Sequence, residues 1–462
     1  MKINVFELTN VLLVIFLFFI LTRKRDVATL LMVLFVYGTL HFAFAAIALT
    51  TNESASLLAA LHIEGGGVLA KLSNLSLLGV VFVLLSVHAY HAFWLSQRSD
   101  KKIVLYVIVV MGALLCGYVP NIRQGDWLQL KNVISLEAML AFILIGFLAT
   151  NGVQTTNAAK FYPWLLGGLL ILGVADCIAI YEVFSHKTWA GTPDRSGAMV
   201  YRASSILFNP NLFGFWAGLV YLGCAYGMHT YKVHRKMILW GMVLASIAIY
   251  FSGSRSSGYL LLGILFIPTL LIKKQFHWLP LIILPLTMLT IYAGAAWLVP
   301  PFVSSSVGWL KVALLGERFA ETPVQLVNYA LMKSDFLLSF TNGITGGITG
   351  GITVQIVESI EGRFVGEGRD AGWLVLYQDV GWFGLGAVIL AVCMLVARGV
   401  RICISHPSPS SVYALAVLCY CLVIGFVMRF QIFPIWLFIS LVLIVCLALW
   451  RQFEISALRI RS

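Results

Sequence analysis

Charged side chains gather in a few short segments of a chain in which only 11% of the residues are charged. Glu367, Arg369 and Asp370 stand directly before an apolar run, and two more arginines, Arg202 and Arg255, lie within short polar motifs. A guanidinium fork binds two oxygens of a phosphate at once and stays ionised. For any one of these arginines, a side chain that snorkels from the end of a membrane span is the alternative. Together they indicate a site for a ligand that carries phosphate.

The composition of the chain indicates that these residues are held in a membrane protein. Hydrophobic residues make up 60% of it and the mean hydropathy is +0.94, whereas soluble domains are roughly 45–50% apolar. Runs of about 20 apolar residues, long enough to cross a bilayer, recur from end to end. We therefore expect an all-α polytopic integral membrane protein with about thirteen transmembrane helices, within a range of twelve to fourteen. The predicted spans are 4–22, 27–50, 68–95, 103–120, 134–150, 162–183, 207–231, 237–252, 257–272, 278–299, 373–397, 410–428 and 432–450.

Loops rich in lysine and arginine alternate along the chain with loops that have few of these residues. By the positive-inside rule, the loops rich in lysine and arginine face the cytoplasm, so the N-terminus lies outside and the C-terminus inside. Residues 1–299 then hold the first ten helices, residues 300–372 form one large outer loop with amphipathic helices, and residues 373–462 hold the last three helices and a short cytoplasmic tail. Anionic lipid of the inner leaflet accounts for most of the net charge of +12, so we expect membrane lipids and no nucleic acid as partners.

Three carboxylates lie in or near the predicted spans: Glu137, Asp176 and Glu182. Ionisable groups inside a membrane often mark a functional site. We favour a structural role over a catalytic one for these three residues.

Two motifs carry a family resemblance. Arg202 is followed by "LFNPNLFGFWAGL", and "SGSRSSGYLLLGI" lies two spans later. They resemble the paired signatures of the O-antigen ligase and polymerase superfamily, which are membrane glycosyltransferases that act on undecaprenyl-diphosphate-linked glycans. In that family a segment after a large periplasmic loop has the pattern His or Asp, Asn, any residue, Tyr, Leu, then Glu-any-Gly-any-any-Gly. The residues at those spacings here are Asp370, Trp373, Leu374, Asp379, Gly381 and Gly384.

The resemblance covers about residues 195–390 and departs from the ligases in one segment. Ligases carry a histidine where this chain has Asp370, and the usual asparagine is Ala371. Wzy-type O-antigen, capsule or exopolysaccharide polymerases more often have an acidic residue there. The resemblance therefore implies a polymerase that joins undecaprenyl-diphosphate-linked oligosaccharide repeats at the periplasmic face of the bacterial inner membrane.

The resemblance also implies roles for single residues. Arginines would bind the diphosphate, and a carboxylate, Asp370 or Glu367, would take the proton of the acceptor hydroxyl. The diphosphate ligands would be Arg202, Arg255, Arg369 and Arg429, and the glycan ligands Asn209, Asn211 and Trp373. An ion pair with Arg369 or Arg363 is the alternative for Asp370, and the Asn-Pro-Asn motif is equally suited to cap a helix with Pro210 in its first turn. No Cys/His set has the spacing of metal ligands, so we expect neither a metal nor another cofactor.

Three partners and two rival functions follow from this interpretation. The partners would be the lipid-linked oligosaccharide itself, a chain-length regulator and a flippase. One rival is an O-antigen ligase, which uses the same donor but transfers the glycan to lipid A-core. The other is a flippase or transporter of lipid-linked oligosaccharides, which is not an enzyme. A flippase is expected to line a central cavity with charge, whereas the charge here concentrates in the outer segments.

Overall fold

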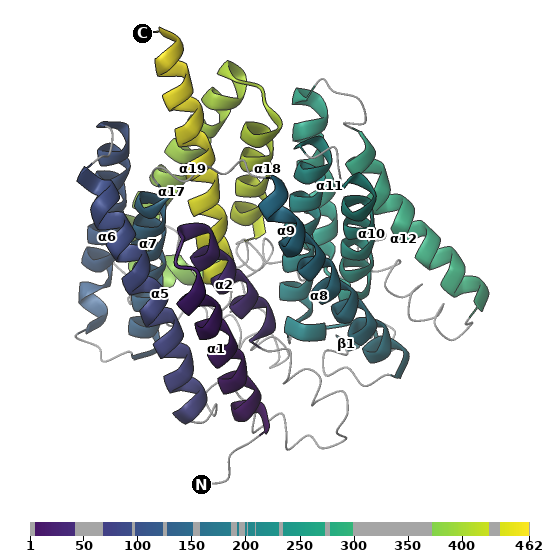
Figure 1. The fold of residues 1–462 in the computed structure, drawn as a ribbon. Coiled ribbons are helices and arrows are strands. Elements are labelled where there is room, and N and C mark those ends of the chain that lie inside the picture. Colours follow the sequence, from purple (N-terminus) through teal and green to yellow (C-terminus); the bar gives the residue numbers. More distant parts are fainter. Residues whose placement is uncertain are drawn as a thin grey trace, which may run out of the picture. The chain divides into compact units, whose positions relative to one another are not determined.

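The computed structural model describes residues 5–41, 68–94, 98–122, 127–150, 158–185, 192–193, 199–200, 202–207, 209–230, 234–272, 278–298, 372–424 and 435–461. Thirteen α-helices make up nearly all of this described part (Figure 1). They are α1 (Val5–Arg23), α2 (Val27–Leu40), α5 (Val68–Trp94), α6 (Arg98–Ile122), α7 (Trp127–Ala149), α8 (Ala158–Ser185), α9 (Pro210–Thr230), α10 (Arg235–Ser252), α11 (Arg255–Leu271), α12 (Leu279–Leu298), α17 (Gly372–Ser405), α18 (Pro409–Ile424) and α19 (Ile435–Arg461). A 3₁₀ turn, η1 (Ser205–Leu207), and a short antiparallel pair, β1 (Thr192–Pro193) and β2 (Met199–Val200), precede α9.

Each of the thirteen predicted ranges overlaps one of these helices, although the ends of 27–50 and 410–428 lie outside the described residues. Six stretches in the described residues are long and apolar enough to cross a membrane. They are Leu75–Trp94, Lys101–Tyr118, Gly167–Ser185, Arg235–Ser252, Phe383–Ser405 and Ile435–Phe453. The expected class, a helical membrane protein, is thus confirmed. The number of spans, the outer loop at residues 300–372 and the orientation of the chain stay predictions.

The chain divides into two compact units. The first holds Met1–Leu85, Gly152–Glu317 and Ser408–Val417. Within it, α10 packs against α8, α9 and α12, and η1 packs against α2, α8 and α9. Helices α8, α9, α10 and α12 are drawn in blue to teal in Figure 1, and α2 in purple. Trp216 of α9, fully buried, donates a hydrogen bond from Nε1 to Thr39 Oγ1 of α2 over 3.1 Å. This unit therefore surrounds the short segment that leads into α9.

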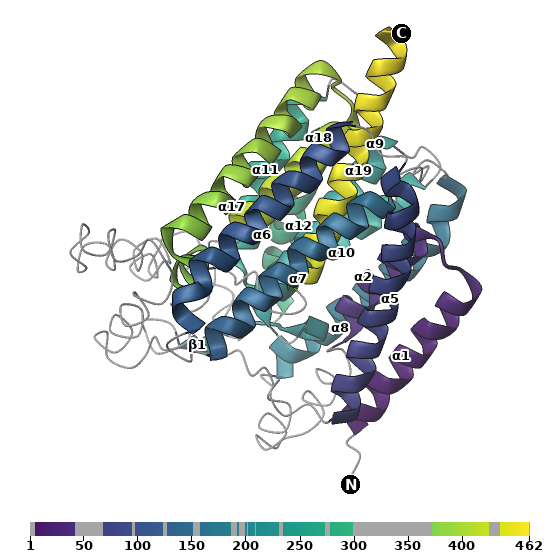
Figure 2. The same ribbon diagram turned by 90° about the vertical axis from the view of Figure 1, so that its left-hand side faces the viewer.

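The second unit holds Ser86–Asn151, Arg318–Pro407 and Leu418–Ser462. Helices α6 and α17 run side by side within it (Figure 2), and α19 packs against α7. Arg451 of α19 is buried, and its Nη2 donates to the carbonyl oxygen of Phe147 over 2.9 Å while its guanidinium lies over the Phe147 ring. A cation that binds one of the last carbonyls of a helix compensates the negative end of its dipole. Arg451 thus fixes α19 to the C-terminal turn of α7.

Helix α17 is interrupted at Gly381, where φ is 65° and ψ is −167°. This combination is open almost only to glycine. Close packing adds to the demand for small residues nearby, because a Cβ at Gly384 would lie within 2.6 Å of the Cβ of Val380. The span predicted at 373–397 falls on α17, and two helical pieces meet within it at Gly381, a glycine of the family-like motif.

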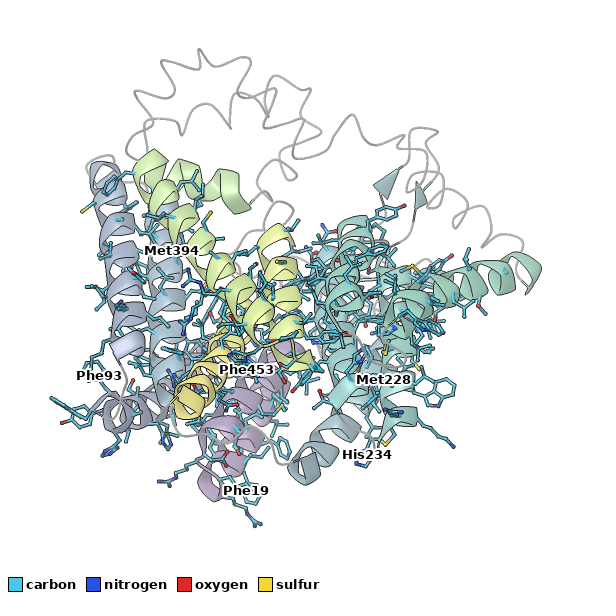
Figure 3. The ribbon with its side chains drawn as sticks, turned by 90° about the horizontal axis from the view of Figure 1, so that it is seen from above. Phe19, Phe93, Met228, His234, Met394 and Phe453 are labelled. Carbon is cyan, nitrogen blue, oxygen red and sulfur yellow. The ribbon has the colours of Figure 1, made fainter. Side chains whose placement is uncertain are left out.

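Large apolar side chains cover the outside of the helices. Phe19 of α1 and Met394 of α17, both labelled in Figure 3, are exposed members of this set. An apolar exterior is the surface expected of helices that face lipid. The polar groups of the first unit that lie near the start of α9 are therefore the candidate functional site.

Candidate functional site

The segment 202–207 leads into α9 and is fastened to α10. The backbone N–H of Ala203 donates to the carbonyl oxygen of Phe251 over 2.9 Å. Phe251 lies in the last turn of α10, where carbonyl groups have no partner within the helix. The segment therefore lies against the end of α10 and satisfies one of its free acceptors.

Arg202 joins three parts of the unit. Its Nε donates to the carbonyl oxygen of Ser252, at the end of α10, over 3.1 Å, and its Nη2 donates to Asn211 Oδ1, in the first turn of α9, over 2.6 Å. Ser252 is 50 residues away in the chain, so the two family-like motifs meet at this guanidinium. The Arg202 side chain is half-buried.

Asn209 caps helix α9. Its Oδ1 accepts hydrogen bonds from the N–H groups of Asn211 and Leu212, over 2.9 and 3.1 Å, and Pro210 follows as the first helical residue. The capping interpretation of the Asn-Pro-Asn motif is confirmed. The Asn209 side chain is also exposed, and its binding to a glycan stays a prediction.

A turn rich in serine separates α10 from α11. Gly253 adopts the left-handed conformation with φ 57° and ends α10, and Ser254 stands at the N-cap position of α11. The hydroxyl groups of Ser254 and Ser257 lie 2.8 Å apart, and the N–H of Ser254 donates to Ser252 Oγ over 3.2 Å. These three serines are buried. The turn is therefore a buried group of hydroxyls, and Arg202 contacts it at the carbonyl oxygen of Ser252.

Gly214 allows α9 to approach this turn closely. A Cβ placed on Gly214 would lie 2.5 Å from the Cβ of Ser254, 2.8 Å from Ser252 Oγ and 3.0 Å from Ser257 Oγ. Only a residue without a side chain fits at that distance. The first turn of α9 and the first turn of α11 are consequently packed together.

Three sources of positive charge lie at this place. The N-terminal ends of α9 and α11 each contribute about half a positive charge, and Arg202 adds a full one. Arg255 is the first residue of α11, although its side chain lies outside the described part. Two helix N-termini and a fixed guanidinium are a suitable combination for phosphate oxygens.

The other predicted site residues are not tested by this geometry. Glu367, Arg369, Asp370 and Arg429 lie outside the described residues. Trp373 belongs to the first turn of α17, but its side chain is also outside the described part. The structure thus brings together Arg202, Asn209 and Asn211, and leaves the predicted base as an expectation.

Sequence reasoning missed several residues of this site. The buried serines and Gly214 belong to the motifs quoted for the resemblance, but the sequence does not show that these two segments meet. Glu182, at the end of α8, accepts hydrogen bonds from two backbone N–H groups of segment 202–207. No local sequence pattern predicts such a contact. Among the described side chains, no group of three or more His, Cys, Asp or Glu residues is placed to hold a metal.

Comparison of the chain with models of known protein families and with curated proteins found no match.

Proposed function

We propose that the chain is a polysaccharide polymerase that joins oligosaccharide repeats carried on undecaprenyl diphosphate. The observation that supports this best is the contact of Arg202 with Asn211 and with the carbonyl of Ser252. It unites two motifs that resemble those of the O-antigen ligase and polymerase superfamily at one cationic point. A transferase that expels a diphosphate needs such a point.

The reaction is a displacement at the anomeric carbon of the donor. The hydroxyl oxygen of the acceptor glycan forms a bond to that carbon, and the bond from the carbon to the oxygen of the diphosphate breaks. Undecaprenyl diphosphate leaves with the electron pair, and the hydroxyl proton passes to a carboxylate. A diphosphate is a good leaving group without protonation, so catalysis depends on stabilising its growing charge.

The residues of the first unit suit the leaving group. Arg202, held by two hydrogen bonds, and the N-termini of α9 and α11 present positive charge that needs no rearrangement during the reaction. Arg255, Arg369 and Arg429 are the further cations of the proposal, and Asp370 or Glu367 is its base. Asn209, Asn211 and Trp373 would contact the sugars. Because Asn211 already binds the arginine, it is also placed to hold Arg202 in position.

We place this site at the periplasmic face of the bacterial inner membrane. The support is the distribution of basic residues between loops, which puts the segments around Arg202 and Arg255 outside. The donor reaches that face after a flippase has turned it over, and a chain-length regulator would act on the growing polymer.

The product that accumulates in cells lacking the protein tests the proposal. A polymerase predicts lipid A-core, or another final acceptor, that carries a single repeat and no longer chains. Polymer stranded on the lipid carrier would instead indicate a missing ligase. Repeats held at the cytoplasmic face would indicate a missing flippase. Either of the last two results contradicts the proposal.

A further inference from the structure

We propose that Glu182 is a positioning residue that holds the Arg202 segment in the geometry needed to receive the diphosphate. The inference rests on the proposed function for its catalytic part. Its structural part rests on the described contacts alone: the side chain of Glu182 binds the Ser204 and Ser205 amides, an arrangement called the clamp below.

The carboxylate of Glu182 is held by the backbone of the Arg202 segment. Its Oε2 accepts hydrogen bonds from the N–H groups of Ser204, over 2.8 Å, and Ser205, over 2.9 Å. The side chain is only 2% exposed, and hydrogen bonds to an ionised acceptor are stronger than those between neutral groups. These two donors replace the water that a carboxyl oxygen would otherwise bind, so the burial of Glu182 is tolerated.

The turn that Glu182 binds has an unusual backbone. Ser205 is the only residue other than glycine among the described residues with a positive φ, 48°, and it is fully buried. Its hydroxyl donates to the carbonyl oxygen of Ala175 over 2.6 Å. A strained conformation of this kind persists only when its surroundings enforce it. Helix α8 enforces it at two points, the Glu182 carboxylate and the Ala175 carbonyl.

The clamp determines where Arg202 lies. Arg202 is two residues before Ser204, and Ala203 between them is bonded to Phe251 of α10. The segment is thus fixed between α8 on one side and α10 on the other. If the Ser204 and Ser205 amides lose their acceptor, the turn relaxes, and the guanidinium no longer meets Asn211 and the Ser252 carbonyl together.

Asp176 provides a matched control on the same helix. It is also buried, at 4% exposure, but neither of its carboxylate oxygens has a hydrogen-bond partner in the part of the chain that the structure describes. Asp176→Asn and Glu182→Gln each remove one buried carboxylate from α8 and keep the shape of the side chain. Only the second changes the acceptor of the Ser204 and Ser205 amides, from a carboxyl oxygen to a carboxamide oxygen.

Amide hydrogen exchange of the purified protein tests the clamp without reference to activity. In peptides that cover residues 202–207, we expect exchange at the Ser204 and Ser205 amides to be about tenfold faster in Glu182→Gln than in the wild type. This factor corresponds to about 1.4 kcal/mol. We expect no change in Asp176→Asn. Unchanged exchange in Glu182→Gln, or equal acceleration in both variants, overturns the clamp.

A double-mutant cycle tests whether the clamp acts through Arg202. At matched amounts of folded protein, Glu182→Gln should lower kcat for polymerisation about tenfold and leave KM for the acceptor unchanged. In an Arg202→Lys background it should have no further effect, because the residue it positions is already gone. A purely structural Glu182 would instead lower the amount of folded protein and add its effect to that of Arg202→Lys.

The two tests keep the failure of the clamp and the failure of the proposed function apart. If exchange responds as expected but the wild-type protein forms no polymer from a lipid-diphosphate-linked repeat, the proposed function is wrong while the clamp stands. If the wild type polymerises and Glu182→Gln does so at the wild-type rate, the positioning role is wrong while the function stands.

Discussion

Replacement of Gly214 by alanine should separate the two helices that form the candidate site. The new Cβ would lie 2.5 Å from the Cβ of Ser254, whereas carbon atoms at rest are about 3.5–4.0 Å apart. The Cβ of Ser254 is fixed to its backbone and cannot rotate away. We therefore expect α9 and the serine turn to move apart by about 1 Å.

The movement should weaken both stability and activity. Overpacking of this kind costs about 1–3 kcal/mol of stability. A shift of about 1 Å would lengthen the bond from Arg202 Nη2 to Asn211 Oδ1 from 2.6 Å beyond the range of hydrogen bonds. Loss of a hydrogen bond to a charged group costs about 1.5–3 kcal/mol. If that energy serves the transition state, the rate should fall about tenfold to a hundredfold.

Gly223→Ala is the matched control, because Gly223 lies in the same helix and a Cβ there meets nothing within 4 Å. Both changes gain the same helix propensity, about 1 kcal/mol, so the difference between the two variants isolates the clash. Thermal denaturation and the amount of polymer per folded protein are the two measurements. Equal melting temperatures and equal activities for Gly214→Ala and Gly223→Ala would refute the close packing described for the site.

Substitutions at three further places test the arginine, the base and the kink. Arg202→Lys should lower polymerisation about tenfold to a hundredfold at matched protein level, because an ammonium cannot reproduce a two-point contact; polymer of normal length and amount would remove the arginine from the mechanism. Asp370→Asn should abolish polymer while protein level and donor binding stay normal, with Glu367→Gln milder. The order reverses if Glu367 is the base, and near-normal activity per molecule with a reduced protein level in Asp370→Asn would indicate an ion pair instead. Gly381→Ala should lower stability by about 1–3 kcal/mol, since φ is 65° there, whereas Gly386→Ala, which meets open space, should not; identical thermal denaturation of the two would contradict the kink.

The helices were predictable because their cause is local. A run of apolar residues must satisfy its own backbone hydrogen bonds in a membrane, and a helix does so without help from distant residues. The same holds for the start of α9, where Asn209 and Pro210 carry the chemistry of a cap within two positions. Local chemistry and composition therefore predicted the fold class, and they gave the cap at Asn209 as one of two interpretations of its motif.

The contacts of the site depend on parts of the chain that are far apart. Arg202 meets the Ser252 carbonyl across 50 residues, and Glu182 reaches the Ser204 amide across 22. Neither pairing leaves a periodic pattern, because each depends on how α8, α9 and α10 pack. The kink at Gly381 was not predicted either: a glycine permits the positive φ without requiring it, and the packing of α17 against α6 joins segments that are far apart in the chain.

We propose that this chain links lipid-diphosphate-borne repeats through a site that contains Arg202. The most direct measurement uses the purified full-length protein in proteoliposomes, supplied with an undecaprenyl-diphosphate-linked repeat and no other enzyme. We expect a ladder of longer glycans, with one undecaprenyl diphosphate released for each new linkage, and a rate about tenfold to a hundredfold lower for Arg202→Lys. Donor recovered unchanged from the folded wild-type protein, or equal ladders from both proteins, would contradict it.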